Sequence, residues 1–233
     1  TRAPMSASII PASGAVTIHY GSQDGLRGTG SQRWSLDSPG VSGSPSAGNP
    51  SAGNLNDGFG SALAIGDFNG DGYGDLAVGA SGSPVSFGGA TKQDAGAVTI
   101  LFGSASGLTA TASLRLTEGS TGVPSDPAND DQFGVVLASG DANGDGRSEL
   151  AIGVARRQAV VVLAGATSGF GSIGISGWSQ DTAGIPDSTE SGDKWGSDLK
   201  FGHYRSAAHA DLVVAARGEN GGAFYQLFQL HSG

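Results

Sequence analysis

The chain has 233 residues, a formal net charge of −9 and only 14% charged residues. Its length suffices for one sizeable domain. The acidic balance argues against nucleic acid as a partner, because phosphates are bound through clustered Lys and Arg, and against electrostatic docking on anionic lipid. No run of 18 apolar residues occurs, so we expect no membrane insertion.

In chain order, the first predicted strands are the short apolar runs Ser8-Ile9-Ile10 and Gly14-Ala-Val-Thr-Ile18. Short β-branched runs bounded by Gly, Pro, Asn and Asp predict strands. Residues 37–57 are rich in Asn, Ser, Pro and Gly, and residues 81–95 in Gly and Ser. These two stretches predict loops inside one domain and not domain boundaries.

An acidic motif follows the first of these loops, at residues 67–75. Oxygen-bearing side chains occupy its first, third, fifth and ninth positions, and its sixth position is a glycine that permits a tight turn. A hard cation such as calcium takes six to eight oxygens at about 2.3–2.6 Å. The motif therefore predicts a calcium loop with these ligands: Asp67, Asn69, Asp71, the backbone carbonyl of Tyr73, and Asp75.

The motif belongs to an internal repeat, which extends beyond the loop on both sides. Phe59-Gly60 precedes the first loop and an apolar run from Leu76 follows it; the same order recurs around residues 141–149. A third copy starts at Trp195-Gly196 and continues through residues 203–211. Each unit also carries a later run that resembles Gly96-Ala-Val-Thr-Ile100. Four short strands per unit at this period favour the blades of a β-propeller.

These residues resemble the FG-GAP repeat family, which builds the seven-bladed propeller of integrin alpha subunits and occurs in many secreted bacterial proteins. The family's calcium loop has the form Asp-x-Asp/Asn-x-Asp-Gly-x-x-Asp, and the resemblance implies the same ligands in residues 67–75. In the second loop it implies Asp141, Asn143, Asp145, the carbonyl of Arg147, and Glu149, although Glu149 departs from the usual Asp. The resemblance therefore implies two structural calcium ions.

The third loop, residues 203–211, keeps only Asp211 of the ligand pattern, and Arg205 would repel a cation, so we expect no metal there. His203 and His209 within it are either transition-metal or acid–base candidates or solvated residues of a decayed loop, the interpretation we favour. Asp130-Asp131 and Asp193 precede the second and third aromatic-Gly strands. They are either partner-binding residues or ordinary polar loop residues.

The predicted fold is an all-β propeller of four-stranded antiparallel blades forming a single domain over residues 1–233. Its parts are a partial blade at 1–36 and repeat units at about 57–120, 131–180 and 193–233. This amounts to about three and a half blades, half of a seven-bladed ring. An open arc exposes sheet edges and faces, so three explanations stay open: a piece of a longer precursor, association with a related chain or a copy of itself, or a truncated form.

The function expected from these features is binding: a secreted, extracellular scaffold for a protein or glycan partner, by resemblance to the family. The alternative is a propeller module or subunit of a secreted hydrolase. The chain lacks Cys, and Gly79-Ala-Ser-Gly-Ser83 only approaches the Gly-x-Ser-x-Gly elbow of hydrolases. No catalytic constellation is visible in the sequence, which favours the binding function.

Overall fold

The computed structural model describes residues 14–46, 57–170, 176–185, 187–205, 207–218 and 224–228. In this part of the chain all regular structure is β, which confirms the all-β prediction. No helix of the described residues is long and apolar enough to span a bilayer. The predicted strand Ser8-Ile9-Ile10 lies outside the described residues.

Two four-stranded antiparallel sheets form the centre of the molecule. The first sheet has the order β10-β9-β6-β5, with β5 at Phe59–Gly66, β6 at Asp75–Ala80, β9 at Ala97–Phe102 and β10 at Thr109–Leu116. The second sheet has the order β11-β12-β13-β16, with β11 at Phe133–Gly140, β12 at Glu149–Val154, β13 at Ala159–Leu163 and β16 at Ser176–Trp178. Each is thus an antiparallel meander that starts at an aromatic-Gly strand.

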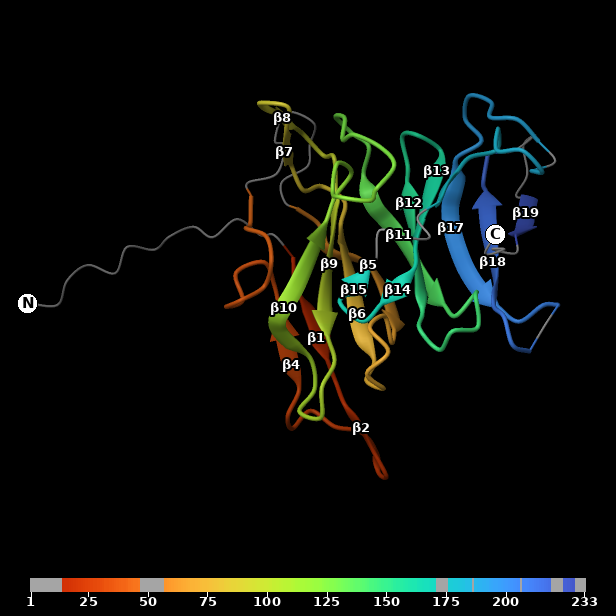
Figure 1. Ribbon diagram of the computed structural model, residues 1–233. Coiled ribbons are helices and arrows are strands. Elements are labelled where there is room, and N and C mark those ends of the chain that lie inside the picture. The colour runs from red at the N-terminus through yellow and green to blue at the C-terminus, as the bar shows by residue number, and fades with distance from the viewer. Residues whose placement is uncertain are drawn as a thin grey trace, which may run out of the picture.

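Two smaller sheets flank them. The third sheet has the order β17-β18-β19, with β17 at Trp195–Gly202, β18 at Asp211–Ala216 and β19 at Phe224–Phe228. The N-terminal pair consists of β1 at Val16–Ile18 and β4 at Gln32–Trp34. Figure 1 shows the three larger sheets side by side in chain order, from the first sheet to the third. This row of meanders is consistent with propeller blades; none of the described sheets closes on itself.

Three short hairpins project from the sheets, and the sequence did not predict them as strands. They are β2 at Gly21–Ser22 with β3 at Gly25–Leu26, β7 at Val85–Phe87 with β8 at Ala90–Lys92, and β14 at Gly165–Ala166 with β15 at Gly169–Phe170. The β7–β8 hairpin corrects the expectation of an irregular loop over 81–95. A hairpin forms there because Gly88 and Gly89 adopt positive φ at its turn.

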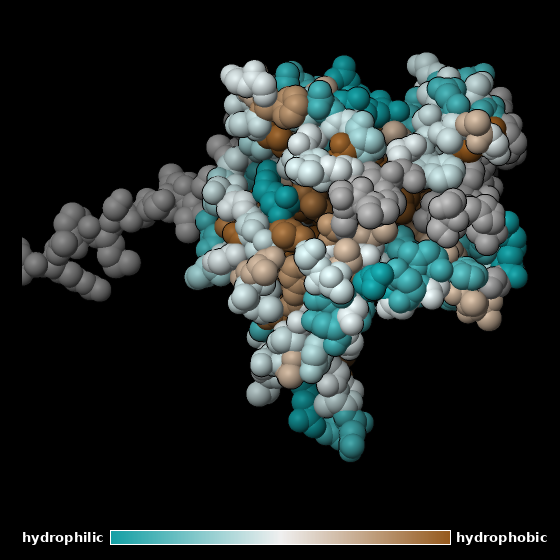
Figure 2. All heavy atoms as spheres, in the orientation of Figure 1, coloured by the Kyte–Doolittle hydropathy of each residue, from teal (hydrophilic) through white to brown (hydrophobic). Residues whose placement is uncertain are grey.

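Every contact between neighbouring sheets encloses one apolar cluster. Between the N-terminal pair and the first sheet it includes Val16, Leu36, Phe59, Val78 and Leu101. Between the first and second sheets it includes Phe68, Ile100, Phe133, Leu150 and Ile152, and between the second and third it includes Val160, Val162, Trp195, Leu199 and Val214. In Figure 2 the visible outer face is mostly pale or polar, and apolar residues show mainly as small areas between polar ones.

The sheets approach so closely that only glycine fits at several contacts. A Cβ added to Gly79 of β6 would lie 2.2 Å from the carbonyl oxygen of Gly134 in β11. Gly96, which has a φ of +88°, would place its Cβ 2.3 Å from the carbonyl oxygen of Phe133. Gly79 and Gly96 therefore serve sheet-to-sheet packing, where backbone meets backbone.

Substituting Gly79→Ala is expected to lower the melting temperature by about 3–10 °C, because an overpacked contact costs about 1–3 kcal/mol or more and each kcal/mol moves Tm by about 2–4 °C at this size. Gly21→Ala is the matched control, since no atom lies within 4 Å of its added Cβ. Differential scanning calorimetry of the two variants measures this difference in melting temperature. Equal melting temperatures would contradict the close-approach explanation.

Candidate metal centre

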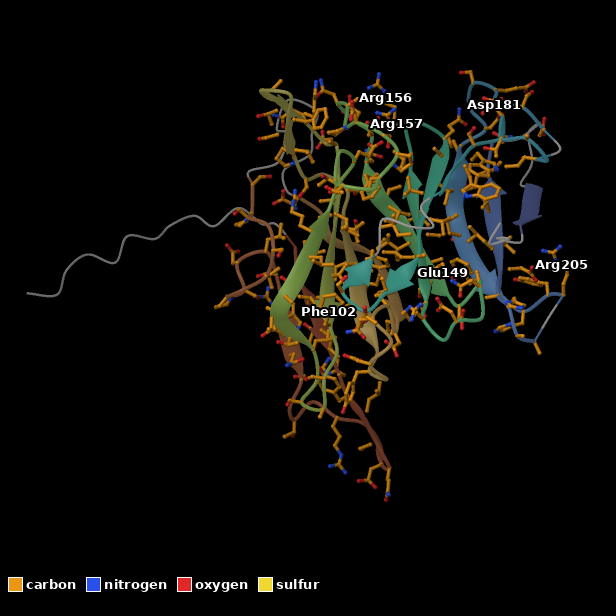
Figure 3. The ribbon with its side chains drawn as sticks, in the orientation of Figure 1. Phe102, Glu149, Arg156, Arg157, Asp181 and Arg205 are labelled. Carbon is orange, nitrogen blue, oxygen red and sulfur yellow. The ribbon has the colours of Figure 1, made fainter. Side chains whose placement is uncertain are left out.

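Each acidic loop joins the first two strands of its sheet. All three loops therefore lie at the same end of the strands, along one edge of the row of sheets. Residues 67–75 join β5 to β6, residues 141–149 join β11 to β12, and residues 203–211 join β17 to β18. Glu149 and Arg205, labelled in Figure 3, lie toward this end, whereas Arg156 and Arg157 lie toward the other. The sequence expectation that the repeat places these loops in equivalent positions is confirmed by the strand order.

In the first loop, side-chain oxygens organise the backbone. Asp67 accepts hydrogen bonds from the amides of Gly70 at 2.7 Å, Asp71 at 3.2 Å and Gly72 at 2.8 Å. Asn69 Oδ1 accepts from the amide of Asp71 at 2.9 Å, and Asp71 Oδ1 accepts from the amide of Tyr73 at 2.9 Å. The first, third and fifth residues therefore each hold the chain in the turn that the motif predicts.

The second loop repeats this pattern. Asp141 accepts from the amides of Gly144 at 2.7 Å and Gly146 at 3.0 Å. Asn143 Oδ1 accepts from the amide of Asp145 at 2.8 Å, and Asp145 Oδ1 accepts from the amide of Arg147 at 2.9 Å. Two stretches separated by a whole repeat thus adopt one hydrogen-bonding scheme.

The ninth position holds a buried carboxylate in both loops. Asp75 accepts from the amide of Phe68 at 2.9 Å, and Glu149 accepts from the equivalent amide of Ala142 at 2.7 Å. Burial raises the pKa of both carboxyl groups, with a smaller contribution from the loop's own aspartates. The longer side chain of Glu149 therefore occupies the place of Asp75 despite its departure from the family pattern.

The donor set of these loops fits a calcium ion. All predicted ligands are oxygens, the atoms that calcium prefers, and a buried carboxylate beside two further aspartates is unfavourable without a compensating cation. In the second loop the Asn143 amide nitrogen donates to Asp145 at 3.3 Å and to Glu149 at 3.2 Å. The positive end of the amide dipole thus lies between two carboxylates.

No three His, Cys, Asp or Glu side chains of the described residues lie close enough together to hold a metal ion. In the first loop the carboxylates of Asp67, Asp71 and Asp75 are instead occupied by backbone amides of the loop. Mutual repulsion of like charges keeps such groups apart. The residues that would hold an ion in this loop are Asp67, Asn69, Asp71, the Tyr73 carbonyl and Asp75.

In the third loop a guanidinium group neutralises the ninth residue. Arg205 Nε and Nη2 donate to Asp211 Oδ1 at 3.1 and 2.7 Å, and the amides of Tyr204 and Arg205 donate to Asp211 Oδ2. These hydrogen bonds from Arg205 hold the pKa of the Asp211 carboxyl below its ordinary value. The side chain expected to repel a cation thus supplies the positive charge itself.

The histidines of this loop have structural neighbours. The carbonyl oxygen of His209 lies 3.2 Å from Nδ1 of His203. A Cβ added to Gly144 of the second loop would lie 2.7 Å from Cε1 of His209. His209 therefore packs on the preceding loop.

Consecutive loops are joined by a repeated hydrogen bond. The amide of Ser148 donates to the carbonyl of Asp67 at 2.8 Å, and the amide of Ala210 donates to the carbonyl of Asp141 at 2.8 Å. In each case the eighth residue of one loop binds the first residue of the loop before it. Arg147 also lies across the first loop, 3.1 Å from the position of a Gly70 Cβ. The loops therefore form one linked row.

At the opposite end, buried aspartates precede each aromatic-Gly strand. Asp57, Asp131 and Asp193 are all buried. Asp57 accepts from Ser83 Oγ at 3.0 Å, and Asp193 accepts from the amide of Glu190 at 2.6 Å. Ser83 ends the phrase that approached a hydrolase elbow, which here forms a turn held by Asp57. Asp131 and Asp193 thus both hold loop backbone through their carboxylates.

Asp131 belongs to a buried charge cluster that sequence reasoning did not find. Arg157 forms ion pairs with Glu118 Oε1 and Asp131 Oδ2, both at 2.9 Å. The pKa of Glu118 is raised to about 7, mainly because the carboxyl group is buried and to a smaller extent because Asp131 lies beside it. The three residues are distant in sequence, and the only signal was an Asp two residues before each aromatic-Gly phrase.

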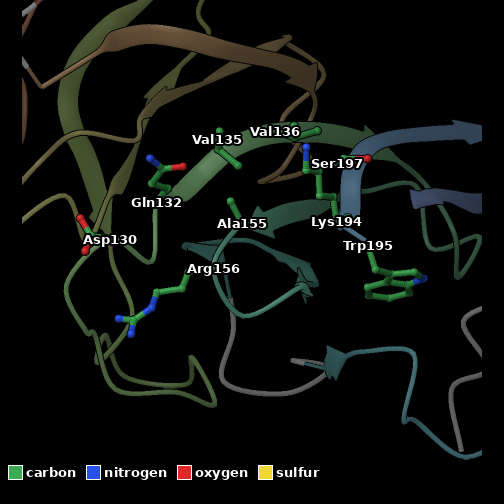
Figure 4. A pocket seen from close by; sticks show the side chains of 10 residues that line it. Asp130, Gln132, Val135, Val136, Ala155, Arg156, Lys194, Trp195 and Ser197 are labelled. Carbon is green, nitrogen blue, oxygen red and sulfur yellow. The ribbon is translucent and has the colours of Figure 1, made fainter. Parts of the chain in front are cut away.

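A hollow of about 400 Å³ opens at this end, between the second and third sheets. Val135, Val136, Ala155 and Trp195 give it apolar walls, and Asp130, Arg156 and Lys194 contribute charged groups (Figure 4). Asp130, Gln132 and Lys194 adopt φ of 64°, 56° and 55°, a region sparsely occupied by residues other than glycine. The turns that shape the hollow are thus held in unusual backbone conformations.

Comparison with protein families gives one match: residues 59–101 match the FG-GAP repeat. The matched segment runs from the start of β5 almost to the end of β9 and contains the first acidic loop. This match confirms the resemblance to the FG-GAP repeat family that was inferred from the sequence. No curated protein matches the chain. The all-β meanders and the FG-GAP repeat are together consistent with a β-propeller-like module.

Replacing Arg205 by Ala is expected to lower Tm by several degrees at pH 7, because it leaves the buried Asp211 carboxylate without its cation. The pKa of Asp211 is lowered in the folded state, so its stabilising contribution is present above the unfolded value near 4 and is lost as pH falls through the folded value. The difference from the parent chain should therefore shrink below about pH 4.

Arg27→Ala is the matched control for this substitution, because the Arg27–Asp24 pair is exposed. Exposed pairs contribute about 0–1 kcal/mol. Thermal melts from pH 7 to pH 3 compare the two variants. If Arg205→Ala and Arg27→Ala melt alike at pH 7, Arg205 does not stabilise the third loop.

Proposed function

We propose that this chain is a secreted, calcium-stabilised β-propeller scaffold that binds a protein or glycan partner and completes its ring with further propeller material. The observation that carries the proposal is the repeated loop scheme. Residues 67–75 and 141–149 present oxygen ligands at equivalent positions on equivalent strand pairs. A turn so rich in carboxylates is stabilised by a bound cation.

The proposed role of calcium is structural. Each ion would neutralise a buried ninth-position carboxylate, Asp75 or Glu149, and fix the turn between the first two strands of a sheet. Since the loops are joined through Asp67 and Ser148, an ordered first loop also supports the second. When bound, the ion supplies positive charge and a rigid coordination shell, and no chemical step is attributed to it.

Secretion is supported by the expected strength of such sites. Extracellular calcium modules bind at about 10⁻⁴–10⁻³ M, which suits the calcium concentration outside cells. The surface is acidic overall, with a net charge of −9. The proposed localisation is therefore extracellular, without insertion into a membrane and without nucleic acid as a partner.

The proposed partner-binding region is the end opposite the acidic loops. The hollow between the second and third sheets combines apolar walls with Asp130, Arg156 and Lys194. Concave sites of this kind, with an apolar lining and a few polar groups, are common binding sites. Loops on a rigid scaffold frequently carry binding functions, and the choice between protein and glycan falls to binding experiments.

The ring itself is proposed to contain more sheets than this chain describes. Two four-stranded sheets, one three-stranded sheet and the N-terminal pair are present among the described residues. About three and a half blades in this chain, half of a seven-bladed ring, is the proposed count. The missing part would come from a second propeller chain or from a copy of this one.

Asp67→Ala and Asp141→Ala are each expected to lower Tm in calcium by several degrees and to reduce the further loss of Tm caused by a chelator. The physical reason is the loss of a first-position ligand that also holds three or two loop amides. Asp37→Ala, an exposed aspartate outside the loops, is the control. A parent melting curve that does not respond to chelator would overturn the calcium role.

A further inference from the structure

The first sheet carries two exposed apolar side chains on its first strand. Leu63 is 51% exposed and Ile65 is 73% exposed. They pair with Val78 and Leu76 of β6, so all four side chains share one face of the sheet. Val78 and Leu76 are buried in the cluster beneath the N-terminal pair. One face is therefore covered over β6 and open over β5.

The equivalent positions of the next two sheets are covered. Leu137 of β11, which pairs with Ile152, is 7% exposed, and Leu199 of β17, which pairs with Val214, is 1% exposed. All three positions are leucines, so the high exposure of Leu63 comes from its position in the molecule and not from its residue type. The other two leucines are covered by the first two strands of a preceding sheet, and the described residues provide no such strand pair over Leu63.

The internal contacts show what this cover is made of. Leu137 lies in one cluster with Ala64 of β5 and Ala77 of β6. Leu199 lies in one cluster with Ala138 of β11 and Ala151 of β12. Ser139, the equivalent of Ile65, also donates to the carbonyl of Ile65 at 2.7 Å. The cover is thus an inner hairpin with small apolar side chains on the facing side.

The N-terminal pair is placed as the outer half of such a sheet. A Cβ on Gly14 would lie 2.2 Å from the carbonyl oxygen of Phe59, just as one on Gly96 would lie 2.3 Å from that of Phe133. β1 pairs only with β4 among the described strands. An inner hairpin added at the other edge of β1 would extend this sheet over Leu63 and Ile65.

A second copy of this chain is a poor source for that hairpin. Its inner hairpins β5–β6, β11–β12 and β17–β18 are each already bonded to an outer strand of their own sheet. Stacking its third sheet on the open face instead would place Asp198 and Lys200 where the interface between the first and second sheets has Ala62 and Ala64. Asp198 lies 3.9 Å from Arg217, and Lys200 is exposed. Burying charges against leucine and isoleucine is costly.

We infer that the open face formed by Leu63 and Ile65 binds the inner hairpin of a different FG-GAP polypeptide, from outside residues 1–233, whose aromatic-Gly strand carries small apolar residues toward β5. The inference rests on the proposed ring completion and names its partner. Continuity with the apolar cluster that already joins the N-terminal pair to β6 supports it. Residues 1–13 contain no aromatic-Gly phrase that would provide this strand.

The test supplies such a hairpin from the chain's own repeat. Residues 131–157 replace residues 1–13, so that Gly14 follows the graft as Gln158 follows residue 157. Leu63→Asp is then introduced into both the full chain and the graft. It should leave Tm of the full chain unchanged within about 1 °C and lower that of the graft by about 5–10 °C, because only the graft buries it.

Leu26→Asp is the control, since Leu26 is 79% exposed on β3, a strand of another sheet; it should change the Tm of neither chain. An equal effect of Leu63→Asp in both chains overturns the inference. So does a dimer of the full chain that sedimentation detects and Leu63→Asp abolishes, because a second copy is then the occupant. The comparison is made within one calcium buffer, so an absent chelator effect contradicts the calcium role without touching this result.

A second measurement covers the case in which the graft does not fold. A synthetic peptide of residues 131–154 is added to the full chain, and amide hydrogen exchange is followed at residues 61–66. We expect the peptide to slow amide exchange at these residues. Leu63→Asp should abolish this protection, and Leu26→Asp should preserve it. Exchange that the peptide leaves unchanged overturns the inference.

Discussion

Neighbouring sheets of this protein are held together where backbone meets backbone at both ends of their inner strands. At one end the first residue of each acidic loop accepts a hydrogen bond from the eighth residue of the next, through Asp67 with Ser148 and Asp141 with Ala210. At the other, Gly96 forms a parallel bridge with Phe133. Both contacts require a tight backbone approach, and the abundant glycines make it feasible.

This constraint explains why the third loop, which lacks the predicted ligand pattern, still makes the same backbone link to the loop before it. The amide of Ala210 is needed by Asp141 whatever fills the third loop. Arg205 neutralises Asp211 there and preserves the turn. The cation thus differs along the row: calcium is proposed for the first two loops, and a guanidinium occupies the third. The side chains differ along the row, whereas the backbone link is the same.

The sequence predicted those elements whose signals are local. The distance from the aromatic-Gly phrase to the first loop residue is the same in every copy, and it placed β5, β11 and β17 and their loops. It did not reveal the cluster of Glu118, Asp131 and Arg157, because Arg157 meets Asp131 from 26 residues away. Contacts between sheets depend on stacking, which no single segment encodes.

The short hairpins were missed for a related reason. Gly165 lies where an added Cβ would meet the carbonyl oxygen of Phe68 at 2.7 Å, so β14 is positioned by the first sheet. Its own residues carry too little β-propensity to predict a strand. Likewise the exposure of Leu63 became visible only beside Leu137 and Leu199, because identical residue types in equivalent repeats differ in what covers them.

The central claim is that the loops at 67–75 and 141–149 each hold one calcium ion and that the loop at 203–211 holds none. Native mass spectrometry of the intact chain in a calcium-containing volatile buffer counts bound ions directly. The account predicts two ions, one of which is lost when Asp67 is replaced by Ala and the other when Asp141 is replaced. A folded chain that carries no ion, or one that keeps both ions after these replacements, would contradict it.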